Sequence, residues 1–201
     1  MKNKKINVKR VTLCILSAIA IYLLYLAMFG KQFFMDKYII EYINSIRNPF
    51  LTSFFKFVTQ LGDAKIIVVL AVTCIFFIKP KKYKYTIPLN LGIIALLNQI
   101  IKAVVQKPRP TGMLINESGY CFPSGHAMAC TVFYGYLIIV VNRNIKNKLL
   151  KYSLIILLSL IILLIIFSRL YLNVHYFSDV LAGFLISFMY LYDIRKNNKL
   201  S

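Results

Sequence analysis

The chain contains only two histidines, and each stands among residues that suit work on a phosphate group. His175 precedes Asp179 by four positions, which places the two side chains on one face if the segment is helical. A carboxylate in that place fixes the imidazole tautomer and stabilises the cation that forms when the ring acts as a nucleophile. His126 follows Ser124 and Gly125, and an imidazole there can supply a proton to a leaving oxygen.

Three cations and one predicted helix start can surround an anion with several oxygens. Lys102, Arg109 and Arg169 supply positive charge, and the two guanidinium groups can each bind such an anion through two hydrogen bonds. Backbone N–H groups at residues 124–126 point outward from the start of a helix, and Gly125 lets the backbone approach the anion closely. Phosphoryl transfer through a phosphohistidine fits this set of residues.

Each of these residues also has a purely structural interpretation. Lys102, near a helix end, can extend its charge to the membrane surface, and Ser124 can simply cap a helix. A histidine at a membrane interface is commonly structural, and His175 with Asp179 can be a simple side-chain pair. Three separate loops nevertheless bring all of these groups to the same level on one side of the membrane, given the helices predicted below. This coincidence favours a functional site.

No metal or cofactor is expected at this layer. Asp179 and Glu117 are the only carboxylates near it, too few for a pair of metal ions, so metal-assisted hydrolysis is disfavoured. The cysteines form no CxxC pair, which predicts neither a zinc site nor a disulfide framework. They are Cys14, Cys74, Cys121 and Cys130.

The elements that must position these groups are apolar helices. Hydrophobic residues make up 59% of the 201 residues and charged residues only 15%, an excess that a soluble domain of this size does not bury. This composition argues against a soluble enzyme and against a disordered chain. We predict an all-α integral membrane bundle formed by a single domain, residues 1–201. Its six transmembrane helices are expected at about residues 11–29, 61–78, 85–105, 123–141, 152–168 and 176–192.

The basic residues indicate the topology of this bundle. Lys and Arg outnumber Asp and Glu by 25 to 6, a balance that in a polar protein would suggest nucleic acid. Here they cluster at both ends of the chain and in two loops that fall on one side if six helices alternate. That side is predicted to be the cytoplasm, so both termini are expected to be cytoplasmic and the candidate site to lie on the outer face. Because the positive charge is explained by membrane topology, no nucleic-acid partner is expected. The outer side carries Asp36, Glu41, Asp63, Glu117 and Asp179.

The segment at about residues 33–57, between the first two predicted transmembrane helices, is amphipathic. Its aromatic and aliphatic residues recur at helical spacing with charged residues between them. This pattern suits a helix that lies in the membrane interface, and an external cap packed on the bundle explains it equally well. Asn48 and Pro49 break the helix, and residues 50–57 can form a second interfacial turn.

Residues 102–179 resemble the type-2 phosphatidic acid phosphatases, a family related to the vanadium haloperoxidases. The family signature has three parts, K-x6-RP, PSGH and SR-x5-H-x3-D, and all three occur here in order without a substitution. They are Lys102-x6-Arg109-Pro110, Pro123-Ser124-Gly125-His126 and Ser168-Arg169-x5-His175-x3-Asp179. The resemblance implies that His175 is the nucleophile, His126 the general acid and Asp179 the group that orients His175. It also implies phosphate binding by Lys102, Arg109, Ser124, Gly125 and Arg169.

The expected function is that of a multi-pass cell-membrane enzyme, a lipid phosphatase that works without a metal. The chain's small size resembles the compact bacterial members of the family, which are often phosphatidylglycerophosphate phosphatases or undecaprenyl-diphosphate phosphatases. Phosphatidylglycerophosphate or a similar lipid phosphate is the expected substrate, with undecaprenyl diphosphate as the alternative. The expected partners are this lipid and the bilayer. Nothing in the sequence indicates the oligomeric state.

Three other functions fit less well. A non-enzymatic anion or lipid transporter would place its polar residues near the membrane midplane, often between inverted repeats, and neither feature is visible in the sequence. Haem held by two histidines is disfavoured because both histidines lie at the interface with neighbours better suited to phosphate. The vanadium haloperoxidases resemble the site but are large and soluble, unlike this chain.

Overall fold

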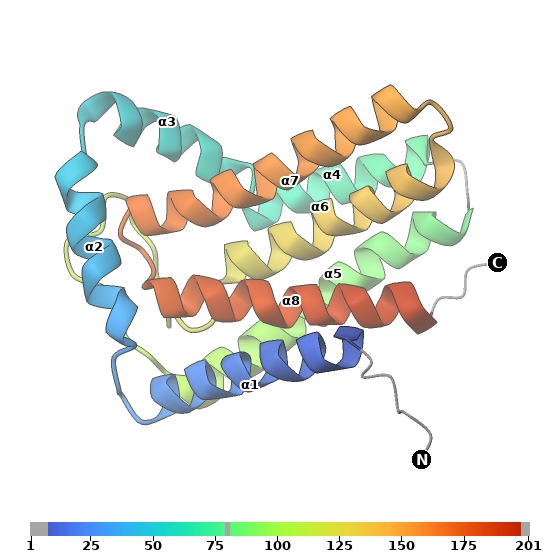
Figure 1. Cartoon of the computed structure of the whole chain (residues 1–201). Helices are drawn as coiled ribbons and strands as arrows, with labels where there is room; N and C mark the ends of the chain where they lie inside the picture. Colours follow the sequence, from blue (N-terminus) through green and yellow to red (C-terminus); the bar gives the residue numbers. More distant parts are fainter. Residues whose placement is uncertain (1–7, 79–80, 198–201) are drawn as a thin grey trace, which may run out of the picture.

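The structure, a computed structural model, describes residues 8–78 and 81–197 (Figure 1). Over those residues it contains eight helices and no strand, and the fold class predicted from the sequence, an all-α membrane bundle, is confirmed. The helices are α1 (Val8–Met28), α2 (Phe34–Ile46), α3 (Pro49–Gln60), α4 (Ala64–Phe77), α5 (Lys81–Val105), α6 (Gly125–Asn144), α7 (Lys148–Tyr171) and α8 (Phe177–Asn197).

Five of these helices, α1, α5, α6, α7 and α8, are long and apolar enough to cross a membrane. At the remaining predicted span, residues 61–78, the observed helix is shorter than expected, because α4 has only 14 residues. A helix of that length extends ~21 Å, less than the ~30 Å of a hydrocarbon core. α3 and α4 are long and apolar enough to cross a membrane only when they are taken together, and a bend of 46° separates them. At the bend, Asp63 caps α4 by accepting a hydrogen bond from the N–H of Lys65 (2.8 Å).

The amphipathic segment predicted at about residues 33–57 forms two helices, α2 and α3. The Asn48 side chain accepts a hydrogen bond from the N–H of Leu51 (2.9 Å) and caps α3, while Pro49 occupies its first position. Figure 1 shows α2 lying across the end of the bundle, whereas the long helices run along it. Asp36 of α2 is completely buried and accepts two hydrogen bonds from Ser178 of α8, so α2 packs directly on the bundle.

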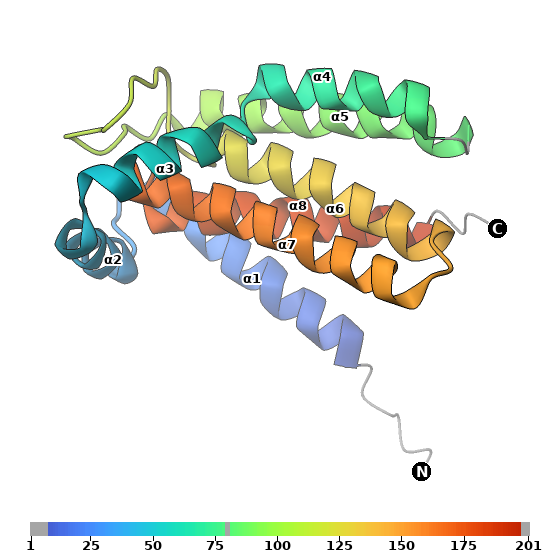
Figure 2. The same cartoon turned by 90° about the horizontal axis from the view of Figure 1, so that it is seen from above.

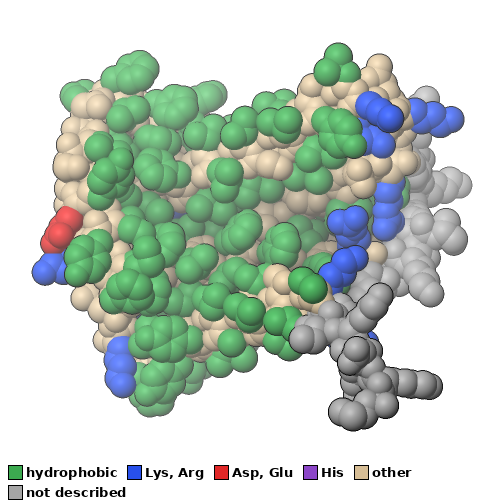
Figure 3. Space-filling view, in the orientation of Figure 1, with side chains coloured by type: hydrophobic (Ala, Val, Ile, Leu, Met, Phe, Trp, Pro, Cys, Tyr) green, Lys and Arg blue, Asp and Glu red, His purple; other side chains and the backbone are tan. Residues whose placement is uncertain are grey.

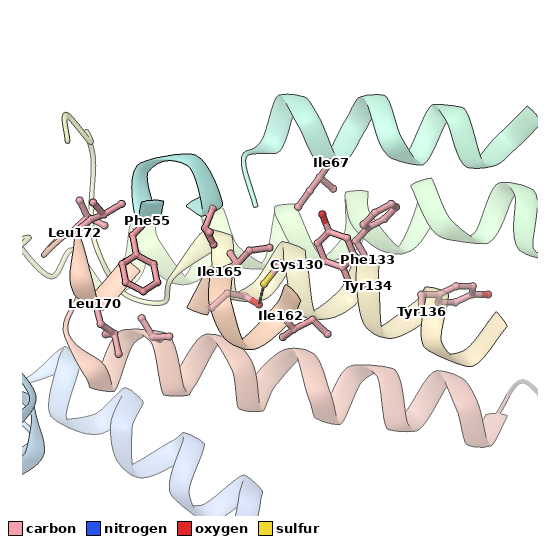
Figure 4. Packing of buried hydrophobic residues seen from close by; sticks show 14 of the residues in the cluster. Phe55, Ile67, Cys130, Phe133, Tyr134, Tyr136, Ile162, Ile165, Leu170 and Leu172 are labelled. Carbon is pink, nitrogen blue, oxygen red and sulfur yellow. Dashed lines mark hydrogen bonds between the residues drawn. The ribbon is translucent and has the colours of Figure 1, made fainter. Parts of the chain in front are cut away.

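α6 forms the centre of the bundle. It packs along α5, α7 and α8, and Figure 2 shows α4 and α5 on one side of it and α1 on the other. Phe133 and Tyr134 of α6 lie in the same buried cluster as Ile162 and Ile165 of α7 (Figure 4). The Tyr134 hydroxyl also donates to the Leu61 carbonyl (2.9 Å), which ties α6 to the bend before α4. This packing fixes the start of α6, where the PSGH residues lie.

The two ends of the bundle differ in charge. α1 begins and α8 ends at the same end, and Figure 3 shows Lys and Arg side chains gathered there beside a largely hydrophobic face. The opposite end carries α2 and the loops that join α5 to α6 and α7 to α8 (Figure 2). All of the predicted site residues belong to these loops or to the adjoining helix ends.

Candidate active site

The turn at residues 123–126 is held by two neighbouring helices. Ser124 is the N-cap of α6, and its backbone N–H donates to the carbonyl of Asp179 (3.0 Å). The buried Asn98 of α5 donates from Nδ2 to the Pro123 carbonyl (3.0 Å). α8 approaches so closely that a Cβ added at Gly183 would lie 2.9 Å from the Ser124 carbonyl oxygen. These contacts set the direction in which the first N–H groups of α6 point.

The loop between α5 and α6 is fastened to the turn that carries His175. Asn173 in that turn has a left-handed backbone (φ 56°), which asparagine adopts more readily than most residues. Its Nδ2 donates to the carbonyl of Thr111 (2.7 Å), and the N–H of Leu114 donates to the carbonyl of Leu172 (3.0 Å). The loop and the turn therefore form one hydrogen-bonded unit around His175.

Arg109 links this unit to the imidazole of His175. Its Nε and Nη2 donate to the carbonyls of Gly119 (3.0 Å) and Ser118 (2.9 Å), and its Nη1 donates to the carbonyl of Val174 (2.9 Å). The same Nη1 lies 3.3 Å from Nε2 of His175. Because three carbonyls fix the guanidinium, its positive charge stays beside the ring nitrogen that faces away from Asp179.

Arg169 and Glu117 complete the positive cluster. Arg169 is completely buried, and its Nη1 donates to the hydroxyl of Thr59 (2.6 Å). Its Nη2 donates to Oε1 of Glu117, whose Oε2 lies 3.7 Å from Nη2 of Arg109. Burial acts to raise the pKa of Glu117, but the two guanidinium groups offset this and hold the pKa below its ordinary value. One ionised carboxylate thus bridges the two arginines that the sequence assigned to phosphate binding.

His175 and Asp179 face each other as predicted, at a distance longer than a hydrogen bond. Nδ1 of His175 lies 3.7 Å from Oδ2 of Asp179 and has no hydrogen-bond partner, while that oxygen accepts from the N–H of Tyr176 (2.8 Å). His175 is 2% exposed, and burial lowers its pKa to about 4 despite the nearby carboxylate. The ring is therefore neutral at physiological pH, the form in which an imidazole nitrogen can attack phosphorus.

Lys107 is a residue of this site that the sequence reasoning missed. Its Nζ lies 2.7 Å from Oδ1 of Asp179 and 3.0 Å from the Ser178 hydroxyl, and 4.5 Å from the centroid of the Tyr176 ring. Ser178 in turn donates from its N–H and its hydroxyl to Asp36 (2.8 Å each). The available signal was its place in Lys107-Pro108-Arg109-Pro110, two positions before the predicted arginine.

Lys102 and His126 are the remaining two of the predicted charged or titratable site residues. Lys102 donates from Nζ to the carbonyl of Tyr120 (2.7 Å), so it supports the loop in addition to contributing charge. His126 is partly buried and lies within electrostatic reach of Lys102, Arg109 and Arg169. A Cβ added at Gly62 would come within 3.1 Å of its Cδ2, so the bend before α4 forms one wall of the His126 position.

Most of the charged side chains described around the site are lysines and arginines, whereas a metal ion is held by carboxylates, thiolates or imidazoles. Across residues 8–78 and 81–197, no group of three or more His, Cys, Asp and Glu side chains lies close enough to hold a metal ion. The four cysteines are all unpaired, and Cys121 donates from Sγ to the Pro108 carbonyl (2.9 Å). The arrangement can therefore bind an oxyanion between Arg109 and Arg169 with His175 beside it.

Comparison with known proteins places this arrangement in a family. Residues 68–197 match the PAP2 superfamily. Phosphatidylglycerophosphatase B of Bacillus subtilis (strain 168) is 29% identical over 158 residues, which cover 75% of this chain and 76% of that protein. The crystal structure of the transmembrane PAP2-type phosphatidylglycerolphosphate phosphatase from Bacillus subtilis is also similar, with a TM-score of 0.78 and 27% identity over 92% of this chain and 97% of that one.

A second solved structure shares the fold. LpxE of Aquifex aeolicus superposes with a TM-score of 0.69 and 24% identity, covering 82% of this chain and 97% of that chain. The family match spans more than half of the sequence and includes all three signature motifs. This chain is therefore a member of the PAP2 superfamily.

Proposed function

We propose that this protein is a membrane lipid phosphatase that works through a phosphohistidine at His175. The observation that carries the proposal is that Nε2 of His175 lies 3.3 Å from Nη1 of Arg109. Arg109 and Arg169 share the carboxylate of Glu117 between them. An oxyanion that replaced this carboxylate would have its central atom close to a neutral imidazole. Family membership and the similar phosphatidylglycerophosphatase support the same reaction class.

In the first step of the proposed reaction, the substrate phosphate replaces the Glu117 carboxylate between Arg109 and Arg169. Nε2 of His175 then attacks phosphorus, while Nδ1–H approaches Asp179, which stabilises the positive charge that develops on the ring. The bond from phosphorus to the lipid oxygen breaks, and His126 donates its proton to that oxygen. The arginines stabilise the charge on the equatorial phosphate oxygens.

In the second step, water takes the place of the departed alcohol. His126, now unprotonated, accepts a proton from this water as its oxygen attacks phosphorus. The P–N bond to His175 breaks, inorganic phosphate leaves, and both histidines return to their starting states. Lys102, Ser124 and Gly125 are proposed to contact the phosphate, with the N–H groups at the start of α6 as further donors.

We propose phosphatidylglycerophosphate or a closely similar lipid monophosphate as the substrate, on the basis of the relatives' activity. The active site is proposed to face the outside of the cell with both termini in the cytoplasm. The separation of charge supports this orientation, because Lys and Arg gather at the end of the bundle opposite the site. Lipid can then reach the site from the outer leaflet.

The experiment that tests the proposed function is phosphate release by purified protein in detergent. The panel contains phosphatidylglycerophosphate, phosphatidic acid and undecaprenyl diphosphate, each assayed with and without vanadate and with a metal chelator. We expect the fastest release from phosphatidylglycerophosphate, inhibition by vanadate, and turnover that survives the chelator. Faster release from undecaprenyl diphosphate would reassign the substrate. Failure to release phosphate from any of the three, with folded protein, would favour an anion or lipid transporter.

The orientation is tested by cysteine labelling in intact cells, with Cys14 replaced by serine. A membrane-impermeant thiol reagent should label Asn116→Cys, next to the site, and should leave Lys148→Cys unlabelled until the cells are opened. Both positions are exposed in the folded protein. Labelling of Lys148→Cys in intact cells would place the active site in the cytoplasm.

A further inference from the structure

A groove far from the site opens between α7 and α8. Both helices pack along α6, but they diverge toward the end where α8 terminates and have little contact with each other (Figure 1). The groove contains a cavity of about 340 Å³. Apolar residues from all three helices form most of its wall, among them Gly135, Ile139, Ile162, Phe184, Phe188 and Leu191.

Two arginines stand at the end of this groove. Arg195 of α8 borders the apolar cavity and also an adjoining cavity of about 370 Å³, which is lined by Arg143 of α6 as well. Both arginine side chains are exposed, and neither forms an ion pair with a carboxylate of the described residues. They lie near the C-terminal ends of α6 and α8, at the end of the bundle where Lys and Arg side chains gather (Figure 3).

The groove is separate from the candidate active site. Its lining contains none of the candidate-site residues and begins along α6 at Thr131. Cys130 of α6 and Ile165 of α7, which lie between the groove residues and the site residues along these helices, are both completely buried and do not line the groove. A Cβ added at Gly62 would lie 2.5 Å from Cγ2 of Ile165 and 3.1 Å from Cδ2 of His126, so Ile165 packs against the bend before α4 close to His126. A molecule in the groove therefore does not reach the phosphate site.

The lining favours hydrocarbon over water. A buried water needs two to four polar partners. The Thr131 hydroxyl is buried and unpaired, while the Ser159 hydroxyl already donates to the Ile155 carbonyl (2.8 Å). Apart from Tyr192 and Arg195, the lining therefore offers a water one free hydroxyl, too few partners to hold it among apolar side chains. An empty groove would forfeit the dispersion contacts of its lining.

We propose that this groove binds one anionic phospholipid from the leaflet at the basic end of the bundle. An acyl chain lies on α6 between α7 and α8, and the headgroup phosphate contacts Arg143 and Arg195. Basic side chains at the mouth of a pocket between transmembrane helices attract anionic headgroups, and arginine binds phosphate through two hydrogen bonds. A zwitterionic lipid carries no net charge to complement the two guanidinium groups.

The test measures lipid binding, which does not depend on whether the protein is a phosphatase. Purified delipidated protein is titrated with phosphatidylglycerol or phosphatidylcholine in detergent, and the bound lipid is counted by native mass spectrometry. The double variant Arg143→Ala/Arg195→Ala is compared with Lys146→Ala/Lys148→Ala. The control variant removes the same charge from exposed residues of the same basic end that do not line the groove.

We expect the wild type and the lysine control to retain one phosphatidylglycerol in preference to phosphatidylcholine. The arginine double variant should bind phosphatidylglycerol roughly tenfold to thirtyfold more weakly. Equal affinity in the two double variants, or equal retention of the two lipids by the wild type, would overturn the proposal.

A second variant tests the acyl-chain position without changing charge. Ser159→Phe places a ring in the cavity from the face of α7 and should abolish retention of phosphatidylglycerol. Its fold is checked by the unchanged elution volume and melting temperature of the lipid-free protein. Undiminished retention in folded Ser159→Phe would show that the chain lies elsewhere and would also overturn the proposal.

Discussion

The two ends of α6 are held in different ways. At the N-terminal end, Ser124 is tied to the backbone of α8, and Asn98 of α5 donates to the carbonyl of the residue before it. At the other end, α7 and α8 diverge, and α6 meets them through aliphatic and aromatic side chains around a cavity. The first end is fixed by directional bonds at defined distances. The second is held by packing, which tolerates changes of shape that conserve volume.

This difference follows from what each end must keep in place. Buried charges need partners, because an unpaired buried arginine or carboxylate is costly. Arg169 is completely buried yet bonded to Thr59 and Glu117, and Lys107 is bonded to Asp179. The network therefore positions the same groups that the proposed reaction uses. Substitutions at the site end should change activity by large factors, and comparable substitutions on the lipid-facing surface should change little.

The largest of these effects is expected for His126→Ala. Loss of the proton donor should lower turnover of a lipid phosphate by about 10²–10⁴-fold. The loss should be much smaller with p-nitrophenyl phosphate, whose leaving group needs no proton. Steady-state kinetics with both substrates measures the two ratios. An equal loss on both substrates would contradict the assignment of His126 as the general acid.

Lys107→Met should have the next largest effect, a loss of activity at acid pH that follows from a change in the pKa of His175. The Lys107 cation lies 2.7 Å from Asp179 and offsets part of the carboxylate charge. Without it, Asp179 stabilises protonated His175 more strongly, so the pKa of His175 should rise from about 4 toward its ordinary value. Because a protonated ring does not attack, the acid side of the pH–activity profile should move to higher pH, with the largest loss of activity between the old and the new pKa.

The His126→Ala background makes this pKa measurable, since His175 is then the only histidine in the chain. Titration of the imidazole by NMR should give a pKa near 4 with Lys107 present and a higher value with Lys107→Met. Lys56→Met, an exposed lysine of α3, serves as the control and should leave the pKa unchanged. An identical pKa in all three proteins would show that Lys107 does not act on the His175–Asp179 pair.

Glu117→Gln should produce a smaller effect in the opposite direction. The Glu117 carboxylate occupies the space between Arg109 and Arg169, so an incoming oxyanion must displace it. The neutral amide competes less well, and vanadate should inhibit the variant at a several-fold lower concentration. Glu41→Gln, which changes an exposed acid on α2 that pairs with Lys37 (3.9 Å), should leave inhibition unchanged. Weaker inhibition of Glu117→Gln would mean that Glu117 assists anion binding.

The smallest effect is expected on the lipid-facing surface of α7. Leu157 is 52% exposed in the isolated chain, and Leu157→Ala should change the free energy of unfolding by less than about 0.5 kcal/mol and leave turnover unchanged. Ile165→Ala, on the same helix but completely buried, should cost about 2–5 kcal/mol. Denaturation in detergent micelles compares the two. Similar losses for both would remove the proposed contrast between packed core and lipid-facing surface.

Much of the fold could be predicted because membrane helices obey a simple length rule. Apolar segments near 20 residues located α1, α5, α6, α7 and α8 to within a few residues. The rule fitted less well at α4, because this helix has 14 residues and is long and apolar enough for a membrane span only together with α3, across a bend of 46°. A length criterion applied to one continuous segment does not detect such a bent pair of helices.

The site was predicted as a set of residues but not as a set of bonds. Motif spacing brought His126, His175 and Asp179 into one layer, because each motif lies at a helix end on the same side. The partners of these residues are backbone carbonyls, such as that of Val174, or side chains distant in sequence, such as Lys107. Sequence spacing carries no information on such contacts. They become visible only when the loop between α5 and α6 is seen docked on the turn before α8.

The central claim is that phosphate passes through a covalent bond to His175, and trapping that intermediate tests it most directly. The His126→Ala variant is incubated with p-nitrophenyl phosphate, then digested, and the phosphorylated peptide is identified by mass spectrometry under alkaline conditions that preserve phosphohistidine. The variant should accumulate phosphate on His175, because formation needs no acid with this leaving group whereas breakdown lacks its base. The same treatment of a His126→Ala/His175→Ala protein should give no phosphopeptide. Phosphate on any other residue, or full turnover of lipid phosphate by His175→Ala, would contradict the account.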